Sequence, residues 1–309
     1  MHTPSGTFPS LTPVVPTVPA PAVGSAGTVR FVAPAPAPSV TYPAAGAVPA
    51  AAGLLPGLES LSPADEDAVW LHDALLGPHS ADIVRYLSLA RRCGGPVLDL
   101  GCGSGRLAVP FARQGFSVEA IDRDADCLER LRAWGRRIGP QVARRLVTTR
   151  ADLAELRLGR TYRLALLAGA MIAAVPPHAR PGLLREIAAH LEPGGALALD
   201  FTAHQPRGLS EEPVRTMAFP VPRFDGVEEW AVARQAFDLD DMSEHISYHC
   251  VRTGKLSSER VVRTTRKWIV DPRRLEADLR AAGLRVEHRR HHRVDERTES
   301  VLLVCRARA

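Results

Sequence analysis

A run of apolar residues that ends in three alternate glycines constrains the fold of this chain more than any other feature. A strand-like segment, Val97-Leu98-Asp99-Leu100, leads into the loop Gly101-Cys102-Gly103-Ser104-Gly105, and a helix-like segment, Leu107–Gln114, follows directly. Glycine has no Cβ, so such a loop can turn tightly and approach a ligand closely. The N-terminus of the next helix offers free N–H groups to a polar ligand. The pattern predicts a nucleotide-type cofactor site at the carboxyl end of a first β-strand.

Short apolar segments and helix-like segments alternate on both sides of this loop. A Glu-Pro-Gly-Gly turn at 192–195 precedes the last apolar segment. Apolar strands separated by amphipathic helices are typical of a parallel sheet covered on both faces. We expect helices over 62–76, 80–92, 106–114, 125–137 and 179–191, and strands over 97–100, 117–121, 146–149, 162–168 and 196–201.

The pattern changes after Phe201, where polar and apolar residues alternate and turn signals recur. Alternation with a period of two is typical of half-buried strands. We expect an antiparallel sheet of three strands, within 227–238, 243–252 and 258–270, then a helix over 272–282 and two final strands over 285–291 and 300–305. The chain then divides into a main α/β domain, residues 59–205 plus 271–309, and an inserted antiparallel β subdomain, residues 206–270.

Residues 1–58 have a composition of their own. They hold twelve of the 26 prolines of the chain and no acidic residue. Proline fixes φ and lacks an N–H, which prevents helix and sheet interiors, so we expect a disordered Pro/Ala-rich tail. The segment lacks the basic start of a secretory signal, and no stretch of the chain is long and apolar enough to span a membrane. We therefore expect a cytoplasmic protein without a membrane partner.

Charge and cysteine content narrow the class of partner. The net charge is +5, but only Lys255 and Lys267 are lysine and aromatic residues make up 5% of the chain, so we expect no nucleic-acid partner. The densest basic run, His288–Arg293, is interpreted as a solvated strand face, with a phosphate-contacting patch as the alternative. The five cysteines show no metal-ligand spacing, which fits a reducing compartment and predicts no metal site.

The loop does not follow the pattern of nicotinamide-dependent enzymes. That pattern, G-x-G-x-x-G, needs a third glycine where the helix packs closely on the strand, and Arg106 occupies its place. Asp99 also lies near the end of the first strand, where a dinucleotide-binding fold usually has an apolar residue. Both positions argue against NAD as the cofactor.

At these residues the chain resembles the class I S-adenosylmethionine-dependent methyltransferases, whose first motif has the form hhD-hG-x-G-x-G. The segment Val97–Gly105 fits that motif throughout, and the resemblance covers about Ser62 to Cys305. It implies a Rossmann-like seven-stranded sheet and S-adenosyl-L-methionine as cofactor. Gly101, Gly103 and Gly105 would form the cofactor loop, and Asp99 would organise this loop and the ammonium group of the cofactor.

The resemblance assigns roles to residues after the next three strands. Asp122 would accept hydrogen bonds from the ribose hydroxyls, although it can also cap the following helix. Asp152 would meet the adenine amino group and Leu153 would flank the ring, with a solvated loop acid as the alternative for Asp152. Ala168 begins a run of small residues that would line the methionine part of the cofactor. Arg106 either pairs with the cofactor carboxylate or lies at the surface.

The methyl acceptor is less constrained. Methyl transfer from a sulfonium needs in-line alignment more than an acid, so the sequence need not carry an obvious catalytic residue, and none is assigned. The segment Trp70–Gly77, the glycine loop and the late sheet together resemble the methyltransferases of daptide-type peptide biosynthesis, and the insertion also resembles the substrate-covering sheet of sugar-amine N,N-dimethyltransferases. The candidates for a base or an acceptor-orienting group are His72, Asp73, His178, His204, His245 and His249.

These resemblances imply N-methylation of an amine on a peptide terminus or small molecule in natural product biosynthesis. The motif Asn-Pro-Pro-Tyr of nucleic-acid amino methyltransferases is absent, and Ala168–Met171 stands in its place. The alternatives are an O- or N-methyltransferase of another small molecule, such as an amino sugar, and a non-catalytic cofactor-binding regulator. The oligomeric state stays open.

Overall fold

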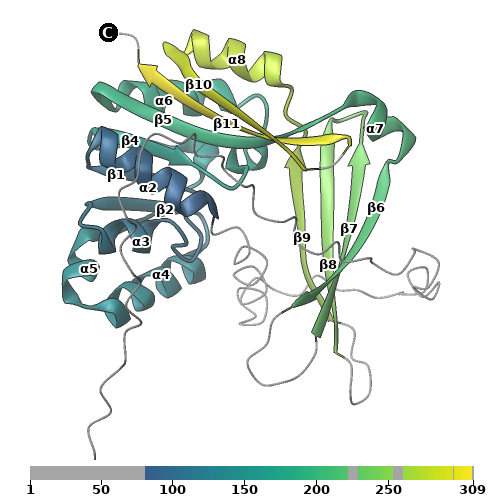
Figure 1. Cartoon of the computed structure of the whole chain (residues 1–309), viewed down its shortest axis with the longest axis horizontal. Helices are drawn as coiled ribbons and strands as arrows, with labels where there is room; N and C mark the ends of the chain where they lie inside the picture. The colour runs from purple at the N-terminus through teal and green to yellow at the C-terminus, as the bar shows by residue number, and fades with distance from the viewer. Residues whose placement is uncertain (1–80, 222–228, 253–259, 295, 308–309) are drawn as a thin grey trace, which may run out of the picture. The chain divides into compact units, whose positions relative to one another are not determined.

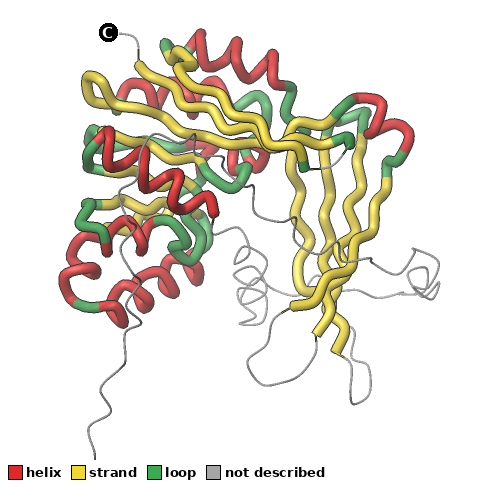
Figure 2. Tube along the Cα trace, viewed as in Figure 1, coloured by secondary structure: helices red, strands yellow, loops and turns green. Residues whose placement is uncertain are grey.

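The computed structural model describes residues 81–221, 229–252, 260–294 and 296–307, with the backbone alone at 81, 207, 217–221, 229–231, 248–252 and 260–264. The predicted tail and the predicted helix over 62–76 lie outside the described residues. All described residues belong to one compact unit. Figures 1 and 2 show two sheets, one of them layered between helices.

The first sheet has seven strands in the order β10-β11-β5-β4-β1-β2-β3. β1 pairs in parallel with β2 and β4, and the sheet extends in parallel to β3 and β5. β11 pairs antiparallel with both β5 and β10. The strands are β1 (Val97–Leu100), β2 (Val118–Asp122), β3 (Leu146–Arg150), β4 (Tyr162–Leu167), β5 (Leu191–His204), β10 (Leu284–Arg293) and β11 (Thr298–Ala307). The predicted Rossmann-like sheet is confirmed.

Helices cover both faces of this sheet because its strands are apolar on both sides. Leu197 and Leu199 of β5 belong to one buried cluster, and Ala196 and Ala198 belong to the other. The helices are α2 (Ala81–Cys93), α3 (Ala108–Arg113), α4 (Ala125–Ile138), α5 (Pro140–Arg145), α6 (Arg180–Ala189) and α8 (Pro272–Ala281), with short 3₁₀ turns η3 (Leu153–Glu155) and η4 (Met171–Ala174). α2, α3 and α4 contribute to one cluster, and α6 and α8 contribute to the other.

β5 begins earlier than the sequence suggests. Leu191 already pairs with Tyr162 of β4, and regular pairing resumes at Ala196, opposite Leu164. The segment between them, predicted as a turn ahead of the strand, is instead an irregularity within the strand, in which Gly194 has a φ of +76°. Such bulges keep a strand in its sheet while they absorb extra residues.

The second sheet has four antiparallel strands, in the order β6-β7-β8-β9. They are β6 (Val214–Val221), β7 (Glu229–Asp238), β8 (Ser243–Arg252) and β9 (Arg260–Trp268), and α7 (Pro206–Glu211) precedes them. The prediction of three strands is wrong, because β6 was missed. β6 contains Pro220, which lacks a donor N–H and argues against a central strand, but β6 lies at the edge of its sheet, where proline is tolerated.

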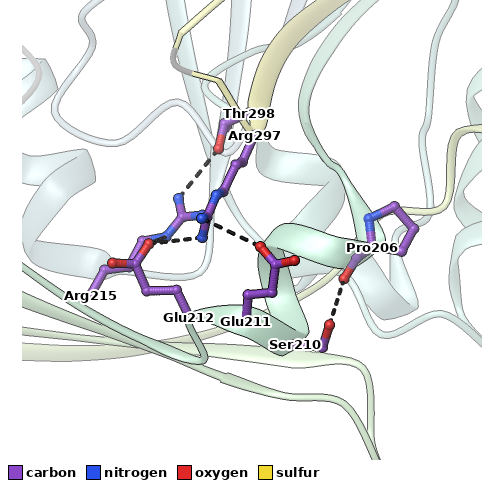
Figure 3. A network of polar contacts seen from close by, with 7 residues as sticks. All are labelled: Pro206, Ser210, Glu211, Glu212, Arg215, Arg297 and Thr298. Carbon is purple, nitrogen blue, oxygen red and sulfur yellow. Dashed lines mark hydrogen bonds and ion pairs between the residues drawn. The ribbon is translucent and has the colours of Figure 1, made fainter.

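Polar and aromatic contacts join the two sheets where β5 ends. The His204 ring meets the Phe237 ring edge-on, with 5.1 Å between the centroids. Arg215 of β6 donates to the hydroxyl of Thr298 at the start of β11 (3.4 Å), and its guanidinium lies 5.6 Å from the Phe237 ring. Arg297 forms ion pairs with Glu211 at 3.4 Å and with Glu212 at 3.1 Å, which fixes α7 against the turn before β11 (Figure 3).

Candidate cofactor site

The glycine loop is wound in a conformation that favours glycine at each predicted position. Gly101, Gly103 and Gly105 have φ angles of +70°, +53° and +98°. Their left-handed backbone is sterically costly for residues with a Cβ. The N–H groups of Gly101 and Cys102 donate to the carbonyl of Ile121 at 2.8 and 3.1 Å, so the loop is tied to the end of β2.

Two of these glycines also provide space for their neighbours. A Cβ on Gly105 would lie 2.7 Å from Cγ of Leu131 in α4, and a Cβ on Gly101 would lie 2.5 Å from Cε of Met171 in η4. Gly105 therefore allows the close packing that the third glycine gives in dinucleotide-binding folds. This explains how Arg106 can occupy the place of that glycine.

Asp122 connects β2 to the glycine loop. Its Oδ2 accepts a hydrogen bond from the N–H of Gly103 (2.8 Å), and its Oδ1 accepts one from the N–H of Asp124 (3.0 Å). The cap of α4 is Asp124, whose side chain accepts from the N–H groups of Asp126 and Cys127. The alternative role of Asp122 as the cap of that helix is therefore taken by another residue. Each Asp122 oxygen keeps a further lone pair that could accept from a ribose hydroxyl.

Asp99 is a buried acid at the centre of the site. It is 3% exposed, and within the described residues no donor reaches its Oδ2. Burial raises the pKa of the Asp99 carboxyl to about 7, while the Arg106 guanidinium opposes this shift and Asp122 adds to it. A buried carboxyl without full compensation is costly, and a cationic ligand would relieve this cost.

Arg106 does not lie free at the surface, and its pairing with the cofactor carboxylate stays a prediction. Its Nη1 lies 2.6 Å from Oδ1 of Asp82 in α2, and both side chains are largely buried. The helix predicted from residue 106 begins at Ala108, so Arg106 belongs to the loop. Arg106 therefore links the cofactor loop to α2.

The three remaining predicted cofactor residues lie after β3 and β4. Asp152 is exposed and caps η3, because its Oδ1 accepts from the N–H of Ala154 (2.8 Å). Leu153 and Ala168 are each 7% exposed and belong to the two opposite core clusters. Their proposed contacts with the adenine and with the methionine part of the cofactor stay predictions.

Sequence reasoning missed Asp200. Its Oδ1 accepts hydrogen bonds from the Tyr86 hydroxyl (2.6 Å) and the N–H of Gly169 (2.8 Å), and its Oδ2 accepts one from the N–H of Ala170 (2.9 Å). Gly169 and Ala170 both have positive φ, at +74° and +56°. Asp200 therefore holds the loop after β4 in its strained shape. The signal was available, since Asp200 stands near the end of an apolar strand as Asp99 does.

The candidate bases are spread over different surroundings. His178 is exposed, and Nε2 of His245 lies 3.3 Å from the Ser243 hydroxyl. The His204 side chain is 4% exposed, and its Nε2 lies 3.9 Å from Oε2 of Glu244 in β8. His72, Asp73 and the side chain of His249 lie outside what the structure describes. Among the described histidines, only His204 lies buried at the junction of the sheets.

The cysteine in the loop is an inert thiol. Burial, and next the charge of Asp99, raise the pKa of the Cys102 thiol. The thiolate is the reactive form, so this environment disfavours a nucleophile. In the described part of the chain, no group of His, Cys, Asp and Glu side chains could hold a metal ion.

The family described as "Methyltransferase domain" matches residues 97–195, which hold β1 to β4 and every predicted cofactor residue. Residues 97–195 therefore match a methyltransferase domain, as the resemblance to the class I enzymes predicts. The cofactor of this class is S-adenosyl-L-methionine, and the buried Asp99 carboxyl and the glycine loop fit its ammonium group and its close approach to the backbone.

The methyltransferase domain has relatives of known structure and name. The cypemycin N-terminal methyltransferase of a Streptomyces species is 29% identical over 164 residues, which cover 52% of this chain and 64% of that protein. The match therefore spans less than two thirds of that relative.

Two solved structures share the fold. An S-adenosylmethionine-dependent methyltransferase from Clostridium acetobutylicum superposes with a TM-score of 0.61 at 14% identity, over 77% of this chain and 97% of that one. The SAM-bound amino pentose methyltransferase CalS10 from Micromonospora echinaspora superposes with a TM-score of 0.57 at 18% identity, over 73% and 90%. Both cover more of this chain than the family match does, so the likeness in fold extends beyond residues 97–195.

Proposed function

We propose that this chain is an S-adenosyl-L-methionine-dependent methyltransferase that methylates an amine of a peptide terminus or small molecule in natural product biosynthesis. The observation that supports it most is the joint arrangement of the glycine loop, Asp122 and Asp99 within the matched methyltransferase domain. When bound, S-adenosyl-L-methionine supplies an electrophilic methyl group on a sulfonium. The protein then has to bind the cofactor, to orient the acceptor and to exclude water.

Different residues would bind the cofactor and cover the acceptor. Asp122 and the Gly101–Gly105 loop would hold the ribose and the amino acid part of the cofactor, with Asp99 facing the ammonium group. Asp200 holds the Gly169–Ala170 turn, beside which the methionine part would lie. Residues 206–270 would cover the acceptor. Contacts between β9 and η4 support this, because Met171 of η4 also packs at the glycine loop.

The peptide acceptor is favoured by the relative whose name states an N-terminal methylation. A peptide N-terminus presents an amine that must lose a proton before it attacks. The buried pair of His204 and Glu244 at the end of β5 is the candidate to accept that proton. An amino sugar is the second candidate acceptor, favoured by the likeness in fold to an amino pentose methyltransferase.

Mass spectrometry tests the proposal. The full chain is incubated with S-adenosyl-L-methionine and a pool of short peptides with free N-termini, and in parallel with amino sugars. We expect methylated peptide, and no product from the same peptides after N-acetylation. Product from the sugars alone would favour the second acceptor. The absence of product from either pool, together with tight cofactor binding, would favour the regulator.

Asp122→Ala provides the cofactor-deficient control. Loss of hydrogen bonds to a charged acceptor should weaken cofactor binding by about 1–3 kcal/mol in calorimetry. The matched variant is Asp126→Ala, since Asp126 is exposed in the first turn of α4. Equal cofactor affinity of the two variants would remove Asp122 from the cofactor site.

A further inference from the structure

β10 is an edge strand with one face uncovered. In the described part of the chain it pairs with β11 and with no other strand, and Figure 1 shows it at the border of the seven-stranded sheet. α8 packs on one of its faces, where Arg289 forms an ion pair with Glu276. An edge of this kind presents backbone N–H and C=O groups that can pair with another strand.

The other face of β10 carries a row of basic residues. His288, Arg290 and His292 are exposed and share this face, and we call them the basic stripe. Among the described residues, none of the three has a hydrogen bond or ion pair from its side chain. Their partners across β11 are uncharged, namely Val304, Leu302 and Ser300.

We propose that the edge of β10 binds an extended acidic peptide segment by strand addition, with carboxylates at alternate positions opposite the basic stripe. Side chains on one face of a strand recur every second residue, about 7 Å apart. A strand added to β10 would place its own alternate side chains about 5 Å from the stripe, within reach of charge pairing. The backbone would supply affinity and the carboxylates would supply register and specificity.

The geometry favours a peptide over a nucleic acid. The unpaired groups of a sheet edge match the spacing of an extended peptide backbone, whereas a nucleic acid would use the charges alone. Charged edges also protect proteins against aggregation, a role that needs no partner. Protection alone does not require basic residues at alternate positions. Glu287, the described acid whose charge acts on His288, is paired with Arg306 at 2.9 Å, which leaves the stripe available to a partner.

This inference goes beyond the proposed function, since it needs neither cofactor nor methyl transfer. β11, β5 and β4 separate β10 from β1, the strand that carries the glycine loop. A segment bound at β10 would therefore belong to a part of the partner remote from any methylated atom. Binding can be measured directly and can succeed or fail independently of activity.

Fluorescence anisotropy with the full chain tests the proposal. The probe is a labelled synthetic peptide, Thr-Glu-Val-Glu-Val-Glu-Thr, at about 0.1 M salt, where exposed charges within about 10 Å still interact. We expect saturable binding that weakens as salt is added. Replacement of the three glutamates by lysine, or methylation of the backbone nitrogens, should abolish it.

Variants locate the site. H288E/R290E/H292E should weaken binding about tenfold or more, because three new carboxylates would lie opposite those of the peptide and repel them. The matched control R136E/R137E/R273E changes three exposed arginines on α4 and α8 and should leave binding unchanged. Thermal unfolding and cofactor binding of both variants should match those of the parent chain.

Three outcomes would overturn the proposal. An absence of binding would leave the stripe as edge protection. Equal binding of the N-methylated peptide and of a single-stranded oligodeoxynucleotide would show a plain electrostatic patch. A dimer in sedimentation that only the stripe variant abolishes would make β10 a contact between two copies of this chain.

Discussion

Asp99 shows how a single buried acid can couple cofactor binding to pH. Because burial raises the pKa of the free protein's Asp99 to about 7, a good part of the population carries a proton there at neutral pH. A carboxyl whose pKa is raised on folding costs the apo-protein stability as pH rises through that value. A cofactor ammonium beside it would favour the carboxylate and reverse this effect.

We therefore expect cofactor binding to release about half a proton at pH 7 and to tighten as pH rises through this value. Calorimetry in buffers of different ionisation enthalpy measures this release. Asp99→Asn should abolish the release, while Asp126→Asn should retain it. Equal binding enthalpy in all buffers for the parent chain would show that Asp99 does not change its protonation.

Asp200 supports the second residue-scale prediction. Asp200→Asn places an N–H₂ group where the carboxylate accepted hydrogen bonds from N–H groups, so one of these backbone donors loses its acceptor. We expect a loss of about 1–3 kcal/mol in the free energy of unfolding and weaker cofactor binding. Tyr86→Phe removes one of the three hydrogen bonds and leaves both backbone donors satisfied, so its cofactor affinity should stay close to the parent value. If the two variants behave alike, the turn after β4 does not depend on Asp200.

Sequence reasoning selected Asp99 and the glycines because each stands at a fixed place in one motif, and Asp122 because it ends the next strand. It passed over Asp200, although this acid stands near the end of an apolar strand, because its partners Tyr86 and Gly169 are distant in the sequence and meet only in the folded sheet. The pairing of Arg106 with Asp82 was missed for the same reason.

At the scale of the element, α4 packs against the glycine loop. A side chain at a loop glycine can therefore lower stability in two ways, through backbone strain and through crowding against α4. Gly105 and Gly115 have the same φ of +98°, but a Cβ on Gly105 would lie 2.7 Å from Leu131, whereas nothing lies within 4 Å of a Cβ on Gly115. Gly115→Ala should therefore cost only the backbone strain, about 1–2 kcal/mol. Gly105→Ala should cost about 1–3 kcal/mol more, because it also overpacks the loop.

Urea unfolding of the two variants measures this difference directly. Equal midpoints would show that α4 moves aside without cost. Cofactor binding should fall in Gly105→Ala and stay unchanged in Gly115→Ala, since Gly115 lies beyond the end of α3.

The elements also show where the pattern of apolar residues predicts strands correctly. The strands of the parallel sheet were found because they are short, apolar and bounded by helices, and only their ends moved. β6 was missed because Pro220 weakens its strand pattern, and β5 was placed late because Pro193 and the two glycines after it read as a turn. In both cases the sheet accepts the proline, at an edge or in a bulge, and a local pattern cannot show this.

At the scale of the whole molecule, Arg297 joins the turn before β11 to α7, the helix that leads into the second sheet (Figure 3). Its carbonyl also accepts from the N–H of Gln205 at 2.9 Å, and its side chain packs over Gly208. If residues 206–270 cover the acceptor, Arg297→Ala should loosen this cover without changing the cofactor loop.

We expect Arg297→Ala to raise the acceptor KM severalfold while the cofactor Kd stays unchanged. Arg273→Ala, a change at an exposed arginine of α8, is the matched control and should alter neither. The prediction is checked by steady-state kinetics for the acceptor and calorimetry for the cofactor. A change in cofactor Kd alone would place the effect of Arg297 in the main domain.

In the described part of the chain, no helix has the length and apolar character needed to cross a membrane.

The number of strands in the second sheet has a consequence for how such enzymes can be rebuilt. Four antiparallel strands in sequential order bring the chain back to the end of the sheet from which it started, whereas three would leave it about 30 Å away, at the opposite end. The exit from β9 therefore lies near the entry to β6, and the segment is a cassette with adjacent ends. Recombination between related chains could exchange such a cassette at only two junctions, and, if residues 206–270 cover the acceptor, the choice of acceptor with it.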